Sequence, residues 1–236
     1  MVLQTEFAQI KGNDLYIDDV KATDLVKQYG TPLYVMSEGH IRKQFNTLKT
    51  KMIDKYENTL PLFASKSFSC IAIYKIAKEY GVGIDCVSAG EISVALKSGF
   101  DPKKIYFHGN NKSYEELQMA LSYGVGTIVV DNAMECELLV QVAKQSGHSV
   151  KALLRVNPGV EAHTHKYIVT AHLDSKFGTS ITHKEEIVHM VQTLSAIPNI
   201  RFEGFHSHIG SQIFDANAYV AEIQTLMKFV YELQEE

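Results

Sequence analysis

Short apolar runs recur along the middle of the chain at an almost constant spacing. Each run is followed by a polar turn and then by a stretch with helical periodicity. The runs begin 22, 22, 22 and 23 residues apart, near Pro61, Gly83, Ile105, Thr127 and Val150. Alternating strands and helices predict a parallel sheet covered by helices, and short equal repeats favour a (β/α)8 barrel of the TIM type.

The helices between these strands have marked starts and stops. They are predicted at Ser69–Tyr80, Gly90–Ser98, Ser113–Tyr123 and Met134–Ser146. Capping boxes or close variants occur at Ser88-x-x-Glu91, Ser113-x-x-Glu116, Asn132-x-x-Glu135 and Thr182-x-x-Glu185. Glycines stand at the expected helix ends, at positions 81, 99, 124 and 147. No GxGxxG motif follows the first strand, which disfavours a dinucleotide-binding fold.

The regular alternation of strands and helices changes after Val156. Residues Asn157–Ser180 predict a long loop rich in His, Thr and Gly. A helix at His183–Leu194, a strand at Arg201–His208 and a helix over 214–236 are predicted to follow. About six barrel strands are therefore expected instead of eight, so the barrel is incomplete within this chain.

The N-terminal segment does not share the 22-residue spacing of the strand–helix units. Asp14–Val20 and Pro32–Met36 predict strands, with a short helix at Thr23–Tyr29 between them. A longer helix is predicted at Gly39–Tyr56. We expect residues 1–38 to form an arm that contributes to a second β-domain, and residues 39–236 to form the barrel.

The composition excludes several classes of function. The net charge of −4 indicates no basic surface for nucleic acid. No apolar run approaches the roughly 20 residues of a membrane span, and Met1–Lys11 lacks the features of a secretory signal. We therefore expect a cytoplasmic protein. Cys70, Cys86 and Cys136 form no CxxC pair, which predicts neither a disulfide framework nor a zinc site.

Polar residues gather where the predicted strands end. In a barrel the active site lies at the carboxyl ends of the strands. The candidates are Lys66, Asp85, Ser88, His108, Asn110, Asp131, Arg155, Asn157, His206, His208 and Ser211.

Three of these candidates carry charge on apolar strands. Lys66 could act as a nucleophilic amine, or its side chain could simply reach out to solvent. Asp85 needs a partner if it is buried, whether that partner is a cofactor or a structural cation. Arg155 needs an anionic or hydrogen-bonding partner, and an ion pair with Asp85 or Asp131 is the simpler alternative.

His206 and His208 are two residues apart and are expected on one face of a strand. A metal site would need a third ligand, and none is evident, so ring stacking or hydrogen bonding is favoured. Ser211 and its neighbouring backbone could hold a phosphate or form a plain polar turn. Together with the Lys66 amine, which can condense with an aldehyde, these groups indicate a site for pyridoxal 5'-phosphate (PLP).

The long loop contains further polar residues. His163 and His165 could be catalytic, although loop histidines are more often solvated. Asp174-Ser175-Lys176-Phe177-Gly178 could form a mobile lip over the site or an ordinary turn.

The chain resembles the fold-type III PLP-dependent decarboxylases, which have an alanine racemase-like barrel. Seven segments carry the resemblance and run in the family's order. They are Phe63-Ala64-Ser65-Lys66, Asp85–Glu91, Phe107–Lys112, Arg155–Gly159, Thr164-His165-x-Tyr167-Ile168, Asp174–Gly178 and His206–Gln212. Within the family the chain is most similar to members that decarboxylate meso-2,6-diaminopimelate to L-lysine in lysine biosynthesis.

The resemblance implies a role for each of five residues. Lys66 would bind the cofactor aldehyde and later shuttle a proton, and His208 would lie over the face of the pyridine ring. Ser211 would contact the phosphate, while Asp85 and Arg155 would line the cofactor pocket. Lys66 and His208 are thus the expected catalytic residues, with no metal.

The resemblance also implies an assembly and a longer protein. It predicts a homodimer with shared active sites, with Lys176 near the site or the dimer partner. The family's Gly-rich phosphate loop, the acidic partner of the pyridine nitrogen and a C-terminal β-domain would lie beyond Glu236. Most substrate contacts come from that part, so we expect these 236 residues alone to have little or no activity.

Some departures and alternatives remain. The lysine motif reads Ala-Ser-Lys-Ser-Phe-Ser where many relatives have Ala-Val-Lys-Ala-Asn, and Ser88-Ala89-Gly90 replaces Ser-Gly-Gly. The alternatives are a decarboxylase for another amino acid or polyamine precursor such as carboxynorspermidine, a racemase on the same fold, and a non-catalytic PLP-binding or regulatory homologue.

Overall fold

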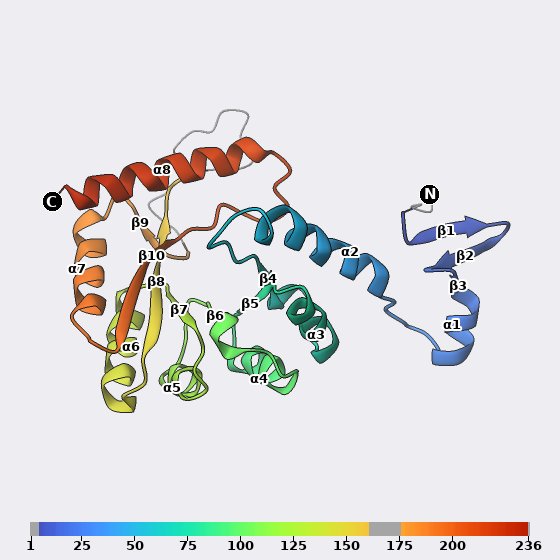
Figure 1. The fold of residues 1–236 in the computed structure, drawn as a ribbon, viewed down its shortest axis with the longest axis horizontal. Helices are drawn as coiled ribbons and strands as arrows, with labels where there is room; N and C mark the ends of the chain where they lie inside the picture. Colours follow the sequence, from blue (N-terminus) through green and yellow to red (C-terminus); the bar gives the residue numbers. More distant parts are fainter. Residues whose placement is uncertain (1–4, 161–175, 236) are drawn as a thin grey trace. The chain divides into compact units, whose positions relative to one another are not determined.

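The computed structural model describes residues 5–160 and 176–235 (Figure 1). The chain divides into two compact units. One runs from the N-terminus to Leu62 and includes Ile76–Val82, and the other comprises Phe63–Lys75 and the chain from Gly83 onward.

The second unit is built on a parallel sheet. Its strands lie in the order β10-β8-β7-β6-β5-β4, with the short β9 paired to β8. Their bounds are β4 Leu62–Ala64, β5 Gly83–Cys86, β6 Ile105–Phe107, β7 Thr127–Val130, β8 Val150–Asn157, β9 Thr179–Ser180 and β10 Ile200–His206. Successive strands are neighbours, as in a barrel wall, but within the described residues β4 and β10 end the row and the barrel is not closed. The predicted α/β fold and its strand positions are confirmed.

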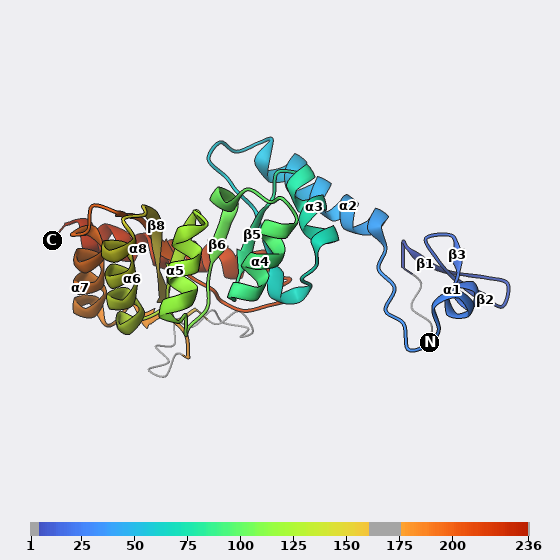
Figure 2. The same cartoon turned by 90° about the horizontal axis from the view of Figure 1, so that it is seen from below.

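A helix follows nearly every strand. These helices are α3 Ile71–Glu79, α4 Ala89–Lys97, α5 Tyr114–Ser122, α6 Ala133–Ser146, α7 Lys184–Ser195 and α8 Ala216–Gln234. Figure 2 shows α4, α5, α6 and α7 side by side along the sheet. Among the described helices, none combines the length and apolar character that crossing a membrane requires.

The core lies between these helices and the strands. All four residues of β7 are buried, which explains its continuous apolar sequence. Ile92, Leu117, Leu139 and Ile187 are fully buried on the inner faces of their helices. Burying each such side chain contributes about 1.5–3 kcal/mol, so this packing holds the strand ends in place.

The predicted helix starts are confirmed in part. Ser88, Ser113 and Asn132 each accept a hydrogen bond from the backbone N–H three residues later. Only Glu116 returns the bond to its own cap residue and completes a capping box. The fourth prediction is wrong, because α7 begins after His183 and has no side-chain cap.

The N-terminal unit contains a small antiparallel sheet and two helices. The sheet comprises β1 Ala8–Lys11, β2 Asp14–Ile17 and β3 Val20–Lys21, and the helices are α1 Ala22–Tyr29 and α2 Glu38–Leu48. The predicted strand Asp14–Val20 is interrupted, because Asp18 and Asp19 take the left-handed conformation, with φ of 45° and 66°. The strand β1 was not predicted.

Two further N-terminal predictions need correction. Pro32–Met36 is not a strand: Tyr34 is 98% exposed and Met36 53%, so this apolar run covers no core here. The predicted helix Gly39–Tyr56 ends as a π-helical turn at Lys49–Ile53. There the Thr50 hydroxyl donates to the Asn46 carbonyl at 2.8 Å, a side-chain bond that disturbs regular helix geometry. Of the predicted loop Asn157–Ser180, residues 161–175 lie outside the described residues.

Candidate functional site

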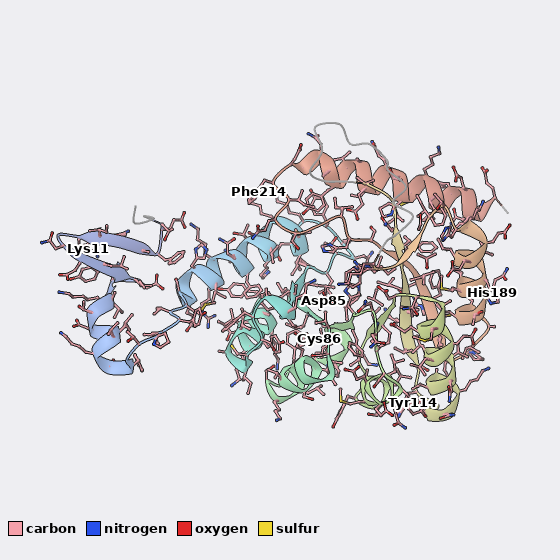
Figure 3. The ribbon with its side chains drawn as sticks, turned by 180° about the vertical axis from the view of Figure 1, so that it is seen from behind. Lys11, Asp85, Cys86, Tyr114, His189 and Phe214 are labelled. Atoms are coloured by element: carbon pink, nitrogen blue, oxygen red, sulfur yellow. The ribbon has the colours of Figure 1, made fainter. Side chains whose placement is uncertain are left out.

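Charged and polar side chains from neighbouring strands meet at the carboxyl edge of the parallel sheet. Asp85 lies on β5, as labelled in Figure 3, and Arg155 lies on β8. His108 and Asp131 directly follow β6 and β7, and His206 ends β10. This convergence is what sequential parallel strands produce, since their carboxyl ends share one edge.

Arg155 is the centre of the cluster. Its Nη1 lies 3.5 Å from Asp131 Oδ1 and 3.2 Å from His108 Nε2. The guanidinium also lies 4.8 Å from the centre of the Phe177 ring. Burial lowers the pKa of Arg155, and the Asp131 carboxylate opposes that effect. The ion pair with Asp131 that the sequence offered as an alternative is therefore present.

His108 is a buried neutral histidine. Its Nδ1 lies 4.0 Å from Asp85 Oδ2, and its ring centre lies 4.6 Å from that of His206. Burial, followed by the charge of His206 and Arg155, lowers the pKa of His108 to about 2. The imidazole is therefore uncharged at neutral pH and can accept a hydrogen bond from Arg155.

Asp85 is a partly buried carboxyl with unusual basicity. Burial raises its pKa to about 6, and the nearby Lys66 ammonium and Arg155 oppose that rise. Lys66 itself is exposed in the short 3-10 turn Ser65–Ser67 that follows β4. An exposed amine therefore stands within electrostatic range of a carboxyl that titrates close to neutral pH.

The turn after β10 presents His208 and Ser211 to solvent. β10 ends at His206, so strand alternation does not continue to His208, and the prediction that both histidines share one strand face is wrong. Burial lowers the pKa of His206 to about 4, and its Nδ1 is buried without a hydrogen-bond partner among the described residues. Burial also lowers the pKa of His208, with Arg155 and Lys66 adding to the effect.

The hydroxyl of Ser207 anchors this turn. It donates to Glu222 Oε1 on α8 at 2.6 Å. Gly210 has φ of 134° and Gln212 has φ of 55°, so the chain reverses sharply around Ser211. Ser211 and Gln212 are exposed in this turn.

Several candidates have local structural roles instead. Ser88 caps α4, and the Asn157 side chain accepts from the Gly159 N–H at 2.9 Å. The Asn110 backbone carbonyl accepts from the Asn132 amide at 3.5 Å. Lys176 lies 5.4 Å from the centre of the Phe177 ring. His163, His165, Asp174 and Ser175 lie outside the described residues.

Sequence reasoning missed the ion pair between Lys112 and Glu135. Lys112 Nζ donates to Glu135 Oε1 at 2.5 Å, and also to the backbone carbonyls of Gly109 and Val129. The sequence pattern places Glu135 only in a helix cap, and nothing in it links Lys112 to Glu135. Across residues 5–160 and 176–235, no group of three His, Cys, Asp or Glu side chains could hold a metal ion.

Comparison with known proteins identifies the family. Residues 38–236 match the model of the pyridoxal-dependent decarboxylase, pyridoxal binding domain. The chain is 42% identical over 228 residues to diaminopimelate decarboxylase of Bacillus subtilis (strain 168), covering 97% of this chain and 52% of the relative. It is 41% identical over 214 residues to the enzyme of that name from Synechocystis sp., covering 87% of this chain and 45% of the relative.

A solved structure supports the same family. The crystal structure of diaminopimelate decarboxylase from M. jannaschii in complex with L-lysine superposes with a TM-score of 0.87 at 32% identity, covering 98% of this chain and 54% of that one. The chain spans about half the length of the relatives it matches. It therefore belongs to the pyridoxal-dependent decarboxylases, and residues 38–236 match the pyridoxal-binding domain of that family.

Proposed function

We propose that this chain is the cofactor-binding part of a PLP-dependent decarboxylase that converts meso-2,6-diaminopimelate to L-lysine. The observation that carries this proposal is its identity of 36–42% to several proteins named diaminopimelate decarboxylase. When bound, PLP supplies a ring that accepts the electrons released as the Cα–carboxylate bond breaks. The chain's own residues would bind that ring, hold its orientation and transfer protons beside it.

The residues present suit this cofactor. Lys66 offers an exposed amine for an aldehyde, and His208 offers an exposed ring for the face of a pyridine. Ser211, beside the positive φ of Gly210, offers a hydroxyl and turned backbone for a phosphate. We assign covalent binding and proton transfer at Nζ to Lys66, ring contact to His208 and phosphate contact to Ser211.

Asp85 and Arg155 are proposed to line the cofactor pocket. They bring opposite charges to one edge of the sheet, with His108 between them. In a partly buried setting fixed charges of this kind orient a polar ligand more strongly than they would in water. The Asp85 carboxyl, with its pKa raised to about 6, also responds to the charge of groups brought beside it.

We further propose how the chain is organised in its parent enzyme. Residues 1–38 would contribute to a β-domain, consistent with the antiparallel sheet of β1, β2 and β3. Residues 39–236 would form part of the PLP-binding barrel. The enzyme would be a cytoplasmic homodimer with shared active sites, and Lys176 would lie near the site or its dimer partner.

Reductive trapping tests the cofactor and the lysine together. The chain is incubated with PLP, reduced with borohydride, and analysed by peptide mapping and by intact mass. A pyridoxyl group is expected on Lys66, and the Lys66→Ala variant should lose it while the control Lys97→Ala, an exposed lysine on α4, keeps it. A label that persists in Lys66→Ala at the same yield contradicts the assignment.

The substrate is tested on the full product of the gene. Release of CO2 from meso-2,6-diaminopimelate is expected, and Lys66→Ala should abolish both that activity and the imine absorbance of bound PLP. Turnover of carboxynorspermidine or racemisation without CO2 would replace the proposed reaction. PLP binding with no turnover of any of these would identify a non-catalytic homologue. Residues 1–236 alone are expected to release little or no CO2.

A further inference from the structure

His108 lies between the two charged residues proposed to line the cofactor pocket. It directly follows β6 and is 7% exposed, whereas Asp85 lies on β5 and Arg155 on β8. Its Nε2 is 3.2 Å from Arg155 Nη1, and its Nδ1 is 4.0 Å from Asp85 Oδ2. One ring therefore faces both charges, one on each nitrogen.

The chemistry of the neighbours determines where the ring proton sits. A guanidinium has only N–H donors, so Nε2 of His108 must accept and cannot carry a proton. The remaining proton of the neutral ring is then on Nδ1, which faces the Asp85 carboxylate. A protonated imidazole would place two donors against each other at the Arg155 contact.

The position of His108 is itself well fixed. Its backbone N–H donates to the Cys86 carbonyl on β5 at 2.7 Å. The next residue, Gly109, has its carbonyl held by Lys112 Nζ at 2.7 Å. The His206 ring packs against the His108 ring at a tilt of 53°. These contacts hold the backbone on both sides of His108 and place the His206 ring against its imidazole.

We propose that His108 is a positioning residue: as the neutral tautomer with its proton on Nδ1, it accepts a hydrogen bond from the Arg155 guanidinium and directs its N–H toward the Asp85 carboxylate 4.0 Å away, a bridge that holds Arg155 in the site. The importance of this bridge for cofactor binding rests on the proposed function. The charged and titratable groups around the ring are Asp85, Arg155, His206, Lys112 and Lys66. Together with burial, the last four lower the pKa of His108 to about 2, which keeps the ring neutral.

The tautomer is tested without cofactor. Nitrogen NMR of the 15N-histidine-labelled chain distinguishes Nδ1–H from Nε2–H and from the imidazolium. His108 should show a protonated Nδ1 and a bare Nε2 at neutral pH and should stay neutral at about pH 5. The exposed His189 on α7, labelled in Figure 3, is the internal reference for a solvent-accessible histidine signal. An Nε2–H tautomer or an imidazolium at His108 would overturn the proposal.

Two variants test the bridge. His108→Gln keeps one neutral acceptor and one donor, whereas His108→Phe keeps a ring with neither. Without PLP, exchange of the Arg155 side-chain N–H protons should accelerate about tenfold in His108→Phe, the factor expected for losing a hydrogen bond to a charged group. It should stay close to the native rate in His108→Gln. Equal acceleration in both variants, or none in His108→Phe, contradicts the bridge.

The same variants connect the bridge to the cofactor. The yield of pyridoxyl-Lys66 should fall about tenfold in His108→Phe and recover in His108→Gln. If the native chain shows the expected tautomer and exchange but takes no label, the bridge stands and the proposal that this chain by itself binds the cofactor fails. If the native chain is labelled but His108→Phe is labelled equally well, the positioning role fails while the proposed function stands. If His108→Phe does not fold, the tautomer of the native chain and the Arg155 exchange rate in His108→Gln still test the bridge.

Discussion

Lys112 Nζ and Glu135 Oε1 lie 2.5 Å apart, and their side chains are 1% and 2% exposed. Lys112 also donates to the carbonyls of Gly109 and Val129, so one ammonium joins the turn after β6 to β7 and α6. Burial lowers the pKa of Lys112 and raises that of Glu135, and the partner's charge opposes the shift in each case. This pair supports the turn that carries His108.

Removing one member of this pair should destabilise the chain strongly. Glu135→Ala leaves a buried ammonium without its counter-charge and is expected to cost about 3–5 kcal/mol. Urea unfolding followed by far-ultraviolet circular dichroism measures the loss. The double variant Lys112→Met with Glu135→Leu removes both charges and should cost less than Glu135→Ala. An unchanged midpoint in Glu135→Ala would show that the pair is dispensable.

The site histidines should make stability fall in mild acid. The pKa of His206 is lowered by burial from 6.5 to about 4. Between these values the unfolded chain binds more protons than the folded one, so the contribution of His206 is complete above 6.5 and is lost as the pH falls toward 4. Urea unfolding at about pH 7.5 and about pH 5 should show that His206→Phe reduces the loss of stability between these pH values by on the order of 1–2 kcal/mol. A loss as large as that of the native chain would contradict this role of His206.

Asp85 should change the pH dependence of folding stability in the opposite direction to His206. Burial raises its pKa from 3.8 to about 6, so the folded state holds the extra proton between these values. Its contribution is therefore complete below 3.8 and is lost as the pH rises through 6. Asp85→Asn removes the stabilisation that Asp85 gains on protonation. The variant should therefore lose more stability than the native chain between about pH 7.5 and about pH 5. Urea midpoints at the two pH values check the sign, and a smaller loss than in the native chain would contradict it.

Because Gly178 has no side chain, it leaves room for Arg155 in the cluster. A Cβ at Gly178 would lie 2.9 Å from Arg155 Cγ and 3.0 Å from the Arg155 carbonyl oxygen, and φ there is 70°. Gly147, with φ of 66°, has no atom within 4 Å of such a Cβ and is a matched control. Gly147→Ala should cost about 1–2 kcal/mol from backbone strain, and Gly178→Ala should cost a further 1–3 kcal/mol, roughly, from the clash. Equal losses in thermal unfolding would show that Arg155 moves aside freely.

The hydrogen bond from Ser207 to Glu222 should hold the turn that presents His208 and Ser211. Removing the carboxylate in Glu222→Ala is expected to cost about 1.5–3 kcal/mol locally, the range for a hydrogen bond to a charged group. Hydrogen exchange of residues 207–212, read by mass spectrometry, should accelerate. Glu232→Ala, which removes an exposed ion pair with Lys228 on the same helix, should leave that exchange unchanged. Unaltered exchange in Glu222→Ala would mean that other contacts order the turn.

The elements of the parallel sheet could be predicted from the pattern of apolar residues alone. Strands beginning at Gly83, Ile105, Thr127 and Val150 lie where the pattern of apolar residues placed them. Local chemistry was sufficient there, because a strand buried on both faces of a parallel sheet reads as a continuous apolar run. The same local reasoning failed at Pro32–Met36, where an apolar run is exposed and has no core to cover.

Which side chains meet depends on the folded arrangement of the strands. Arg155 contacts His108 across 47 residues of sequence and Asp131 across 24, and Lys112 reaches Glu135 across 23. The repeat of about 22 residues predicted that these strand ends share an edge. It carried no information on which donor faces which acceptor. Those pairings depend on strand register, side-chain direction and the cost of burying a charge without a partner, and these act only when the chain has folded.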